Sequence, residues 1–162
     1  MVAGGVAVAV TVRATPSGPG EAPVAQTVTV TAGPPPSPVA LPVEQADEKT
    51  CAGWAAARAT VVEATKALAV IPDGLNVLSP EVQTHPEWKA GVAKASALFV
   101  WTAATLERSK AAGTSPMLDH VTDTTAGALR AMATAYRTCA PEAGDAFDVF
   151  NKSQKTMDWL CR

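Results

Sequence analysis

The chain has 162 residues and a net charge of −2 at pH 7, with a pI near 5.6. It contains no basic run and no basic stretch interleaved with aromatic residues, so the composition argues against nucleic acid as a partner. Only two charged side chains, Arg13 and Glu21, occur in residues 1–43. The composition therefore divides the chain near Val43 into a nearly uncharged arm and a charged, Ala-rich body of about one small domain.

The first 13 residues form an apolar segment that ends at Arg13. It is shorter than the ~20 apolar residues that span a bilayer, and it lacks the positively charged start of a signal peptide. We expect residues 1–13 to be the end of a signal or membrane anchor whose start lies upstream of Met1. The alternative is an ordinary apolar N-terminus, or a weak export signal used as it stands.

Residues 14–43 are rich in Pro, Thr and Gly. Proline at this density breaks helices and favours extended polyproline II, so we expect a disordered stalk on the order of 90 Å in reach. The clustered Thr, Ser and Pro resemble O-glycosylated stalks of exported proteins, and a plain disordered linker is the alternative.

Apolar residues at spacings of three and four predict a first helix over residues 44–71. Pro72, Asp73 and Gly74 follow it and end it. The stripe that this spacing places on one face consists of Trp54, Ala57, Val61, Ala64, Leu68 and Ile71.

A second helix is expected over residues 86–112. Thr84 and Glu87 match a capping box around Pro86, and Gly113 fits a C-cap. Its stripe, which is expected to be buried, consists of Trp88, Val92, Ala95, Phe99, Thr102 and Leu106.

Ser115 as N-cap and Pro116 at the first helical position predict the start of a third helix. Its stripe consists of Leu118, Val121, Thr125, Ala128, Met132, Ala135 and Cys139. A shorter fourth helix is expected from near Pro141, with a stripe of Phe147, Phe150, Gln154, Met157 and Cys161. We prefer a break at Pro141 to a kinked continuous helix, because the Ala-Pro-Glu-Ala-Gly sequence is typical of a turn.

Short connections make neighbouring helices antiparallel. The sequence therefore predicts an all-α domain over residues 44–162, an up-down-up-down four-helix bundle preceded by an extended arm. Because the stripes consist largely of Ala, Val and Thr, the core is expected to be thin and to benefit from a covalent link.

Three cysteines allow three single pairings. In an up-down-up-down bundle, Cys51 at the start of the first helix and Cys161 at the end of the fourth lie at the same end, and Cys139 lies at the other. We predict a Cys51–Cys161 disulfide that closes a loop of about 110 residues, with Cys139 as a free thiol packed like a small apolar residue. A disulfide implies an oxidising compartment, and three reduced thiols in a cytosolic protein are the alternative.

The sequence contains no Gly-rich phosphate loop, zinc pattern or nucleophile elbow. His120 lies between Asp119 and Asp123, and His120 and Asp123 can share a helix face. Such a pair can bind a divalent ion or exchange protons, but we favour the structural explanation, an acidic first helical turn with an exposed His. We expect no catalytic residue, no metal site and no cofactor.

Four of the eight aromatic residues are Trp. Trp54 and Trp88 fall on predicted stripes and are expected to be buried, whereas Trp101 and Trp159 fall beside theirs. All four are candidates for a partner or ligand surface, with Trp101 and Trp159 as the better ones. The alternative is that the four rings fill gaps that Ala leaves in the core.

The layout resembles small Ala/Pro-rich, membrane-anchored or secreted proteins of high-GC actinobacteria. The resemblance rests on the VAGGVAVAV start, the TVTVTAGPPPSP stalk, the Cys51-x-x-Trp54 entry to the first helix and the Trp-Leu-Cys of residues 159–161. It covers most of the chain through compositional motifs, it implies an extracytoplasmic location, and it offers no catalytic residues that could be carried over to this chain.

We therefore expect a non-enzymatic binding or structural module of the cell envelope, whose partner is an envelope protein or a cell-wall component. A carrier of an apolar ligand, lipid or haem, between the helices is the alternative. Haem would need His120 or Met132 to face the core as an axial ligand. A hydrolase or metal enzyme built on His120, Asp119 and Asp123 is a third hypothesis.

Overall fold

The computed structural model describes residues 39–162, which form one compact unit. In this part of the chain all regular secondary structure is α-helical. The helices are α1 (Val43–Leu68), α2 (Pro80–Thr84), α3 (Pro86–Ser109), α4 (Pro116–Thr138) and α5 (Ala143–Leu160). The predicted apolar segment 1–13 and the predicted stalk up to residue 38 lie outside the described residues.

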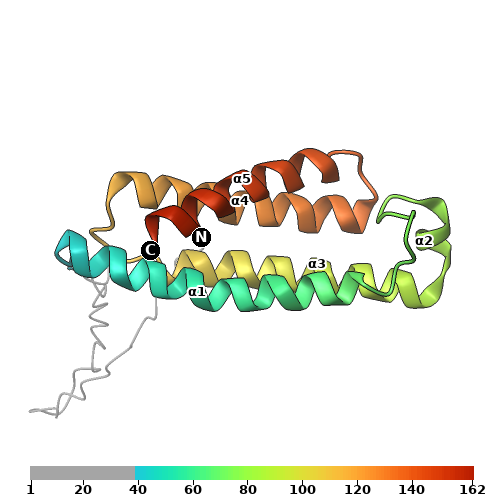
Figure 1. Cartoon of the computed structure of the whole chain (residues 1–162), viewed down its shortest axis with the longest axis horizontal. Coiled ribbons are helices and arrows are strands. Elements are labelled where there is room, and N and C mark those ends of the chain that lie inside the picture. The colour runs from blue at the N-terminus through green and yellow to red at the C-terminus, as the bar shows by residue number, and fades with distance from the viewer. Residues whose placement is uncertain (1–38) are drawn as a thin grey trace, which may run out of the picture. The chain divides into compact units, whose positions relative to one another are not determined.

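The four long helices pack in chain order, with α1 against α3, α3 against α4 and α4 against α5 (Figure 1). The predicted all-α class is therefore confirmed, although five helices build the domain where four segments were expected. Figure 1 shows α5 inclined to α1, so that the two helices approach each other near the C-terminus of α5 and diverge towards its N-terminus. The N-terminal part of α5 is therefore left without a facing helix on the α1 side.

The core is narrow because most of its buried positions carry Ala or Thr. The largest fully buried side chains include Leu106, Leu118, Leu129, Met132 and Met157. Three of the four buried Thr side chains, Thr102, Thr122 and Thr125, satisfy their hydroxyls within their own helix, as Thr122 does by donating to the Leu118 carbonyl at 2.7 Å. Small side chains thus allow the helices to approach closely without leaving buried polar atoms unpaired among the described residues.

The segment before α3 differs from its prediction. α2 was not predicted, and the expected capping box of Thr84 and Glu87 is wrong. Thr84 belongs to α2, where its hydroxyl donates to the Pro80 and Glu81 carbonyls. His85 has extended backbone and is both the C-cap of α2 and the N-cap of α3. The start of α2 repeats the Ser-Pro pattern of α4, with Ser79 as N-cap and Pro80 in the first turn.

Three further helix ends depart from the prediction. α1 ends at Leu68, where residue 71 was expected. α3 ends at Ser109, so Gly113 is not its C-cap; it has φ +101° in the loop to α4, where an added Cβ would meet the Leu41 backbone. Ser115 is the N-cap of α4, as predicted, but its side chain makes no capping hydrogen bond. The predicted break at Pro141 is confirmed, since α4 ends at Thr138 and α5 begins at Ala143.

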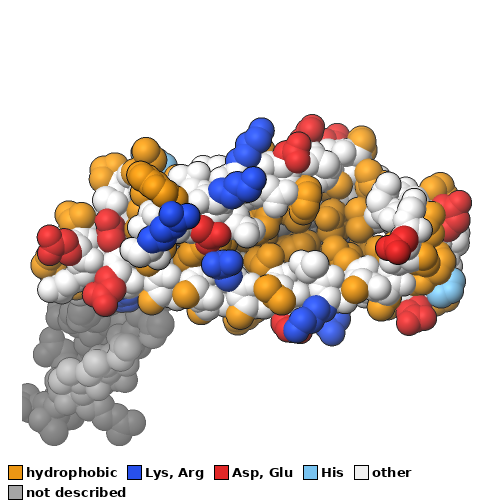
Figure 2. Space-filling view, viewed as in Figure 1, with side chains coloured by type: hydrophobic (Ala, Val, Ile, Leu, Met, Phe, Trp, Pro, Cys, Tyr) orange, Lys and Arg blue, Asp and Glu red, His pale blue; other side chains and the backbone are white. Residues whose placement is uncertain are grey.

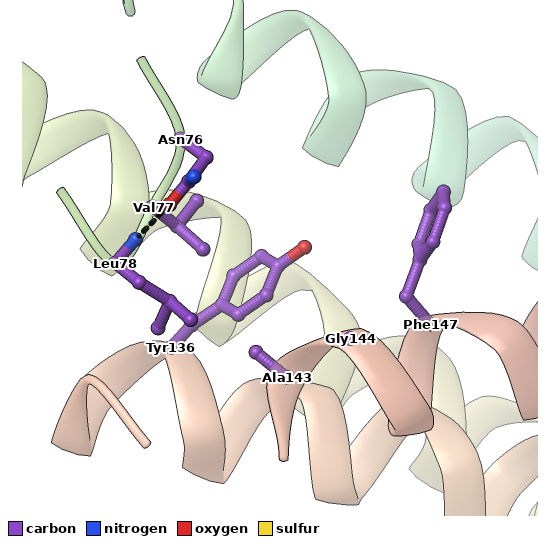
Figure 3. Close-up of a pocket in the computed structure, with 7 residues that line it drawn as sticks. All are labelled: Asn76, Val77, Leu78, Tyr136, Ala143, Gly144 and Phe147. Carbon is purple, nitrogen blue, oxygen red and sulfur yellow. Dashed lines mark hydrogen bonds between the residues drawn. The ribbon is translucent and has the colours of Figure 1, made fainter. Parts of the chain in front are cut away.

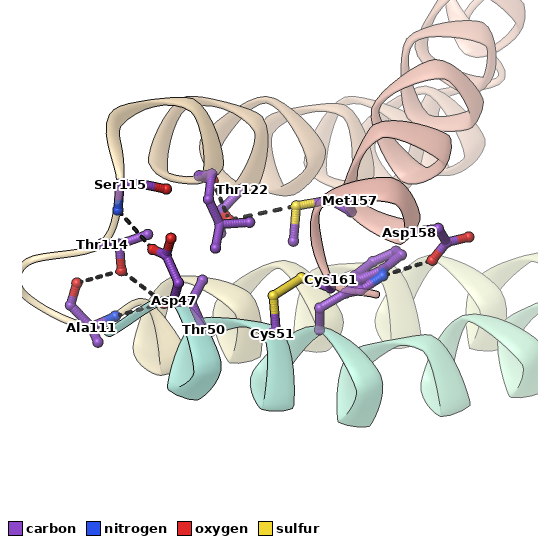
Figure 4. Close-up of a disulfide and its surroundings, with 12 residues drawn as sticks. Asp47, Thr50, Cys51, Ala111, Thr114, Ser115, Thr122, Met157, Asp158 and Cys161 are labelled. Atoms are coloured by element: carbon purple, nitrogen blue, oxygen red, sulfur yellow. Dashed lines mark hydrogen bonds between the residues drawn. A yellow bond between two sulfur atoms is a disulfide. The ribbon is translucent and has the colours of Figure 1, made fainter. Parts of the chain in front are cut away.

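The α3–α4 loop is fastened to α1 by polar contacts (Figure 4). The Thr50 hydroxyl accepts the Ala111 amide at 3.1 Å and lies 2.8 Å from the Thr114 hydroxyl. Asp47 Oδ1 accepts the Ser115 amide at 2.7 Å. These bonds satisfy loop and helix-terminal amides that would otherwise lack partners.

Cys51 and Cys161 form a disulfide beside this loop, with their Cα atoms 5.3 Å apart (Figure 4). The pairing is the one that the sequence predicts, and it joins α1 to the end of α5. Cys139 is a free thiol, but the expectation that it packs as a core residue is wrong, because it is exposed. It follows the last residue of α4 with φ +54°, a left-handed conformation that turns the chain out of the helix.

Two helical glycines have opposite surroundings and make a matched pair. A Cβ added to Gly91 on α3 would lie 2.5 Å from the Ala67 carbonyl oxygen and 2.7 Å from Val70 Cγ2, whereas one added to Gly127 on α4 has nothing within 4 Å. We expect Gly91→Ala to lower the free energy of unfolding by about 1–3 kcal/mol through overpacking. Gly127→Ala should raise it by about 1 kcal/mol through helix propensity. Urea unfolding followed by circular dichroism measures both, and two changes of the same sign would contradict the close α1–α3 approach.

Candidate functional site

The predicted cluster around His120 does not form a convergent site. His120 is exposed, and Asp119 and Asp123 both pair with Lys110, whose Nζ lies 3.0 Å and 2.7 Å from their carboxylates. Burial disfavours the charged form of Lys110, but the hydrogen bonds that its ammonium donates to Asp123 and Asp119 outweigh burial and raise its pKa. Within residues 39–162, no group of three His, Cys, Asp or Glu side chains is arranged to hold a metal ion.

The four tryptophans occupy different environments. Trp54 is buried, and its Nε1 donates to Asp158 Oδ1 at 2.8 Å. The prediction that Trp88 is buried is wrong, because Trp88 is half-buried and stacks on His85 with ring centroids 4.0 Å apart. Trp101 on α3 and Trp159 on α5 are 53% and 63% exposed, in line with their selection as surface candidates.

A cavity of about 290 Å³ lies beside the loop between α1 and α2 (Figure 3), which Figure 1 shows at the opposite end of the domain from the C-terminus. We call it the Tyr136 cavity. One wall is the loop of residues 76–78, which follows α1, and the other is the first part of α5, with Ala143, Gly144 and Phe147. Tyr136, near the end of α4, lies between the two walls. Three separate parts of the chain therefore converge on one space.

The loop wall is held in place by its own hydrogen bonds. Asn76 Oδ1 accepts the Leu78 amide at 2.8 Å, and the Ser79 hydroxyl accepts the Asn76 amide at 3.0 Å. Gln83 of α2 donates to the Val77 carbonyl at 2.6 Å, and Val82 anchors α2 in the core. The short helix that the sequence did not reveal thus fixes this wall of the cavity.

Tyr136 supplies the polar group of the cavity. Its side chain is 8% exposed and its ring packs edge-on against Phe99, with centroids 5.8 Å apart. Figure 3 shows the hydroxyl pointing into the space between the two walls. Among the hydrogen bonds of residues 39–162, none involves this hydroxyl, and it is not sealed from solvent. Burial raises the pKa of Tyr136, so the hydroxyl keeps its proton and is a hydrogen-bond donor at neutral pH.

Phe147 borders the cavity on the α5 side and is 47% exposed. The sequence placed it on the buried stripe of the fourth helix, which is wrong, because nearly half of Phe147 is exposed where α5 diverges from α1. Figure 2 shows hydrophobic side chains gathered around a hollow between α1 and α5. A half-exposed aromatic ring beside an unpartnered hydroxyl is typical of a binding site rather than of a closed core.

Sequence reasoning missed this cavity. Tyr136 is the only tyrosine of the chain and directly follows Ala135 of the predicted third stripe, which was a usable signal. No pattern in the sequence indicates the position of residues 76–78, because that position depends on α2, which the sequence did not predict.

No family model, no curated protein and no solved structure matches the chain. Among residues 39–162, no helix is long and apolar enough to cross a membrane.

Proposed function

We propose that this chain is a non-enzymatic binding module of the cell envelope that works outside the cytoplasm, and that the Tyr136 cavity receives what it binds. One observation carries the proposal: the unpartnered hydroxyl of Tyr136, whose residue is 8% exposed, opens into an apolar cavity whose Phe147 wall is half-exposed. Leaving a large aromatic side chain half-exposed forgoes about half of the ~1.5–3 kcal/mol that full burial would contribute. A ligand or partner that covers the ring recovers that energy.

The location outside the cytoplasm is supported by the Cys51–Cys161 disulfide, since such bonds persist in oxidising compartments. The apolar segment 1–13 and the Pro-rich residues 14–38 add a tether and a spacer to this proposal. An up-down-up-down order of the four long helices belongs to it as well, because that order brings the two cysteines to one end and leaves the cavity at the other.

The cavity also favours a second candidate, a carrier of an apolar ligand. Of its two forms, lipid fits better than haem. His120 is exposed on α4, Met132 is buried in the core, and neither of these proposed axial ligands lines the cavity.

Photo-cross-linking from the cavity wall tests the proposal. Benzoylphenylalanine at position 147 of the full chain, in the cells that produce it, should capture an adduct of one discrete mass after irradiation. Position 149 is the matched control. Val149 is 45% exposed, nearly the same as Phe147, but it lies two residues later and so on the other side of α5. The reason for the expected difference is that only position 147 borders the cavity.

A macromolecular adduct would identify an envelope partner, and an adduct of a few hundred daltons would identify a carried ligand. Adducts that are equal at positions 147 and 149, or absent from both, would contradict the proposed binding site.

A further inference from the structure

We infer that the Tyr136 cavity binds an uncharged amphiphile, a slim apolar body that ends in a carbonyl group of an ester or ketone, with the Tyr136 hydroxyl donating to that carbonyl. The inference rests on the carrier form of the proposed function and names its ligand class. Three properties of the cavity lead to it: the shape and size of the apolar walls, the single aimed donor, and the absence of charge among the lining residues.

The walls are suited to an aliphatic or flat aromatic body. Val77 and Leu78 border the cavity on the loop side, and Ala143 and Phe147 border it on the α5 side. A volume of about 290 Å³ lies just below the ~300–1,000 Å³ typical of ligand pockets in proteins, which favours a slim ligand. Because Phe147 is half-exposed, a longer molecule can extend past it towards solvent.

The hydrogen-bond donors of the cavity indicate that the polar end of the ligand is an acceptor. The Tyr136 hydroxyl has no acceptor among the described residues, although its side chain is more than nine-tenths buried. Asn76 uses Oδ1 to accept the Leu78 amide, which leaves its Nδ2 group, a second donor, on the opposite side of the side-chain amide. A ligand that displaces water from these donors must offer them an acceptor, since a polar group left unpaired by the ligand is costly. A carbonyl oxygen is such an acceptor.

The lining residues also indicate that the head group is neutral. None of the seven residues that line the cavity is charged. A carboxylate or ammonium would lose its hydration there without gaining an ionic partner. An ester or ketone loses much less hydration free energy, and a hydrogen bond from the Tyr136 hydroxyl compensates this loss.

Gly144 offers a way to fill the cavity without disturbing the core. It lines the cavity, and a Cβ added to it has nothing within 4 Å. Gly127 on α4 also has open space and does not line this cavity, so Gly127→Leu is a control for a helical Gly→Leu change. Tyr136→Phe removes the hydroxyl and retains the ring that packs on Phe99.

The experiment is a fluorescence titration of the full oxidised chain with prodan, an uncharged naphthyl ketone whose emission shifts to the blue in apolar surroundings. We expect saturable binding by the unchanged chain and by Gly127→Leu, and at least a tenfold loss of affinity in Gly144→Leu. Tyr136→Phe should weaken binding about threefold to tenfold, the effect of one net hydrogen bond. Methyl decanoate should displace prodan at a concentration at least tenfold lower than the decanoate anion does.

No saturable binding, or equal affinity for Gly144→Leu and Gly127→Leu, would overturn the inference. An unchanged affinity in Tyr136→Phe, or equal displacement by ester and anion, would overturn the carbonyl and neutral-head assignments. Circular dichroism confirms that each variant is folded. Photo-cross-linking from position 147 tests the proposed function separately. A protein captured there would support the binding module even if prodan and methyl decanoate do not bind.

Discussion

Replacing both Cys51 and Cys161 by Ser is expected to lower the free energy of unfolding by about 5 kcal/mol. The disulfide links residues 110 positions apart, and a link over so long a loop removes much of the conformational entropy of the unfolded chain. It also joins α5 to α1 at the end where those helices approach each other (Figure 4). Because the core is thin, the domain without the disulfide should be close to unfolding at 37 °C.

Urea unfolding followed by circular dichroism measures the effect, and Cys139→Ser is the matched control. Cys139 is exposed and unbonded, so its replacement should change the free energy of unfolding by no more than about 0.5 kcal/mol. A double variant as stable as the unchanged chain would show that the core alone holds the domain and that the disulfide is dispensable.

The second large effect is expected at Trp54. Trp54→Ala should lower the free energy of unfolding by about 3–5 kcal/mol, the range for truncating a buried aromatic side chain. The ring is 2% exposed, and its Nε1 donates to Asp158, which also pairs with Arg58 at 3.3 Å. Trp54→Phe keeps most of the buried area and should lower the free energy of unfolding by about 1–3 kcal/mol, chiefly because the hydrogen bond to the Asp158 carboxylate is lost.

Trp101→Ala is the control for Trp54→Ala, because Trp101 is 53% exposed on α3. We expect its effect on unfolding to stay within about 0.5 kcal/mol. Equal losses in the free energy of unfolding for Trp54→Ala and Trp101→Ala would mean that both rings are buried. That result would support the alternative in which all four tryptophans fill gaps in the core.

The features that could be predicted from the sequence depend on short-range patterns. Apolar spacing and the Ser115-Pro116 pair locate the long helices to within a few residues, because these signals act over one or two helical turns. The pairing of Cys51 with Cys161 also follows, because short connections fix which helix ends meet. Gly113, predicted as a C-cap, does have positive φ, but it lies in the α3–α4 loop and not at a helix end.

The features that could not be predicted depend on how the helices diverge. Phe147 lies on the apolar stripe of α5 yet is exposed, because an apolar period states which face turns inward and not whether another helix covers it. Cys139 ends the stripe of α4 in the same way, but its left-handed backbone takes it out of the helix. The Tyr136 cavity needs the angle between α1 and α5 and the loop held by α2, and neither is encoded in a local pattern.

Native mass spectrometry of the full chain, purified without reductant or detergent from the cells that produce it, tests the central claim most directly. The claim is an oxidised chain that carries an uncharged ligand in the Tyr136 cavity. We predict a mass two hydrogens below that of the reduced chain, with an added mass of a few hundred daltons that is absent from Gly144→Leu and present in Gly127→Leu. A fully reduced chain, or an adduct that persists in Gly144→Leu, would contradict the claim.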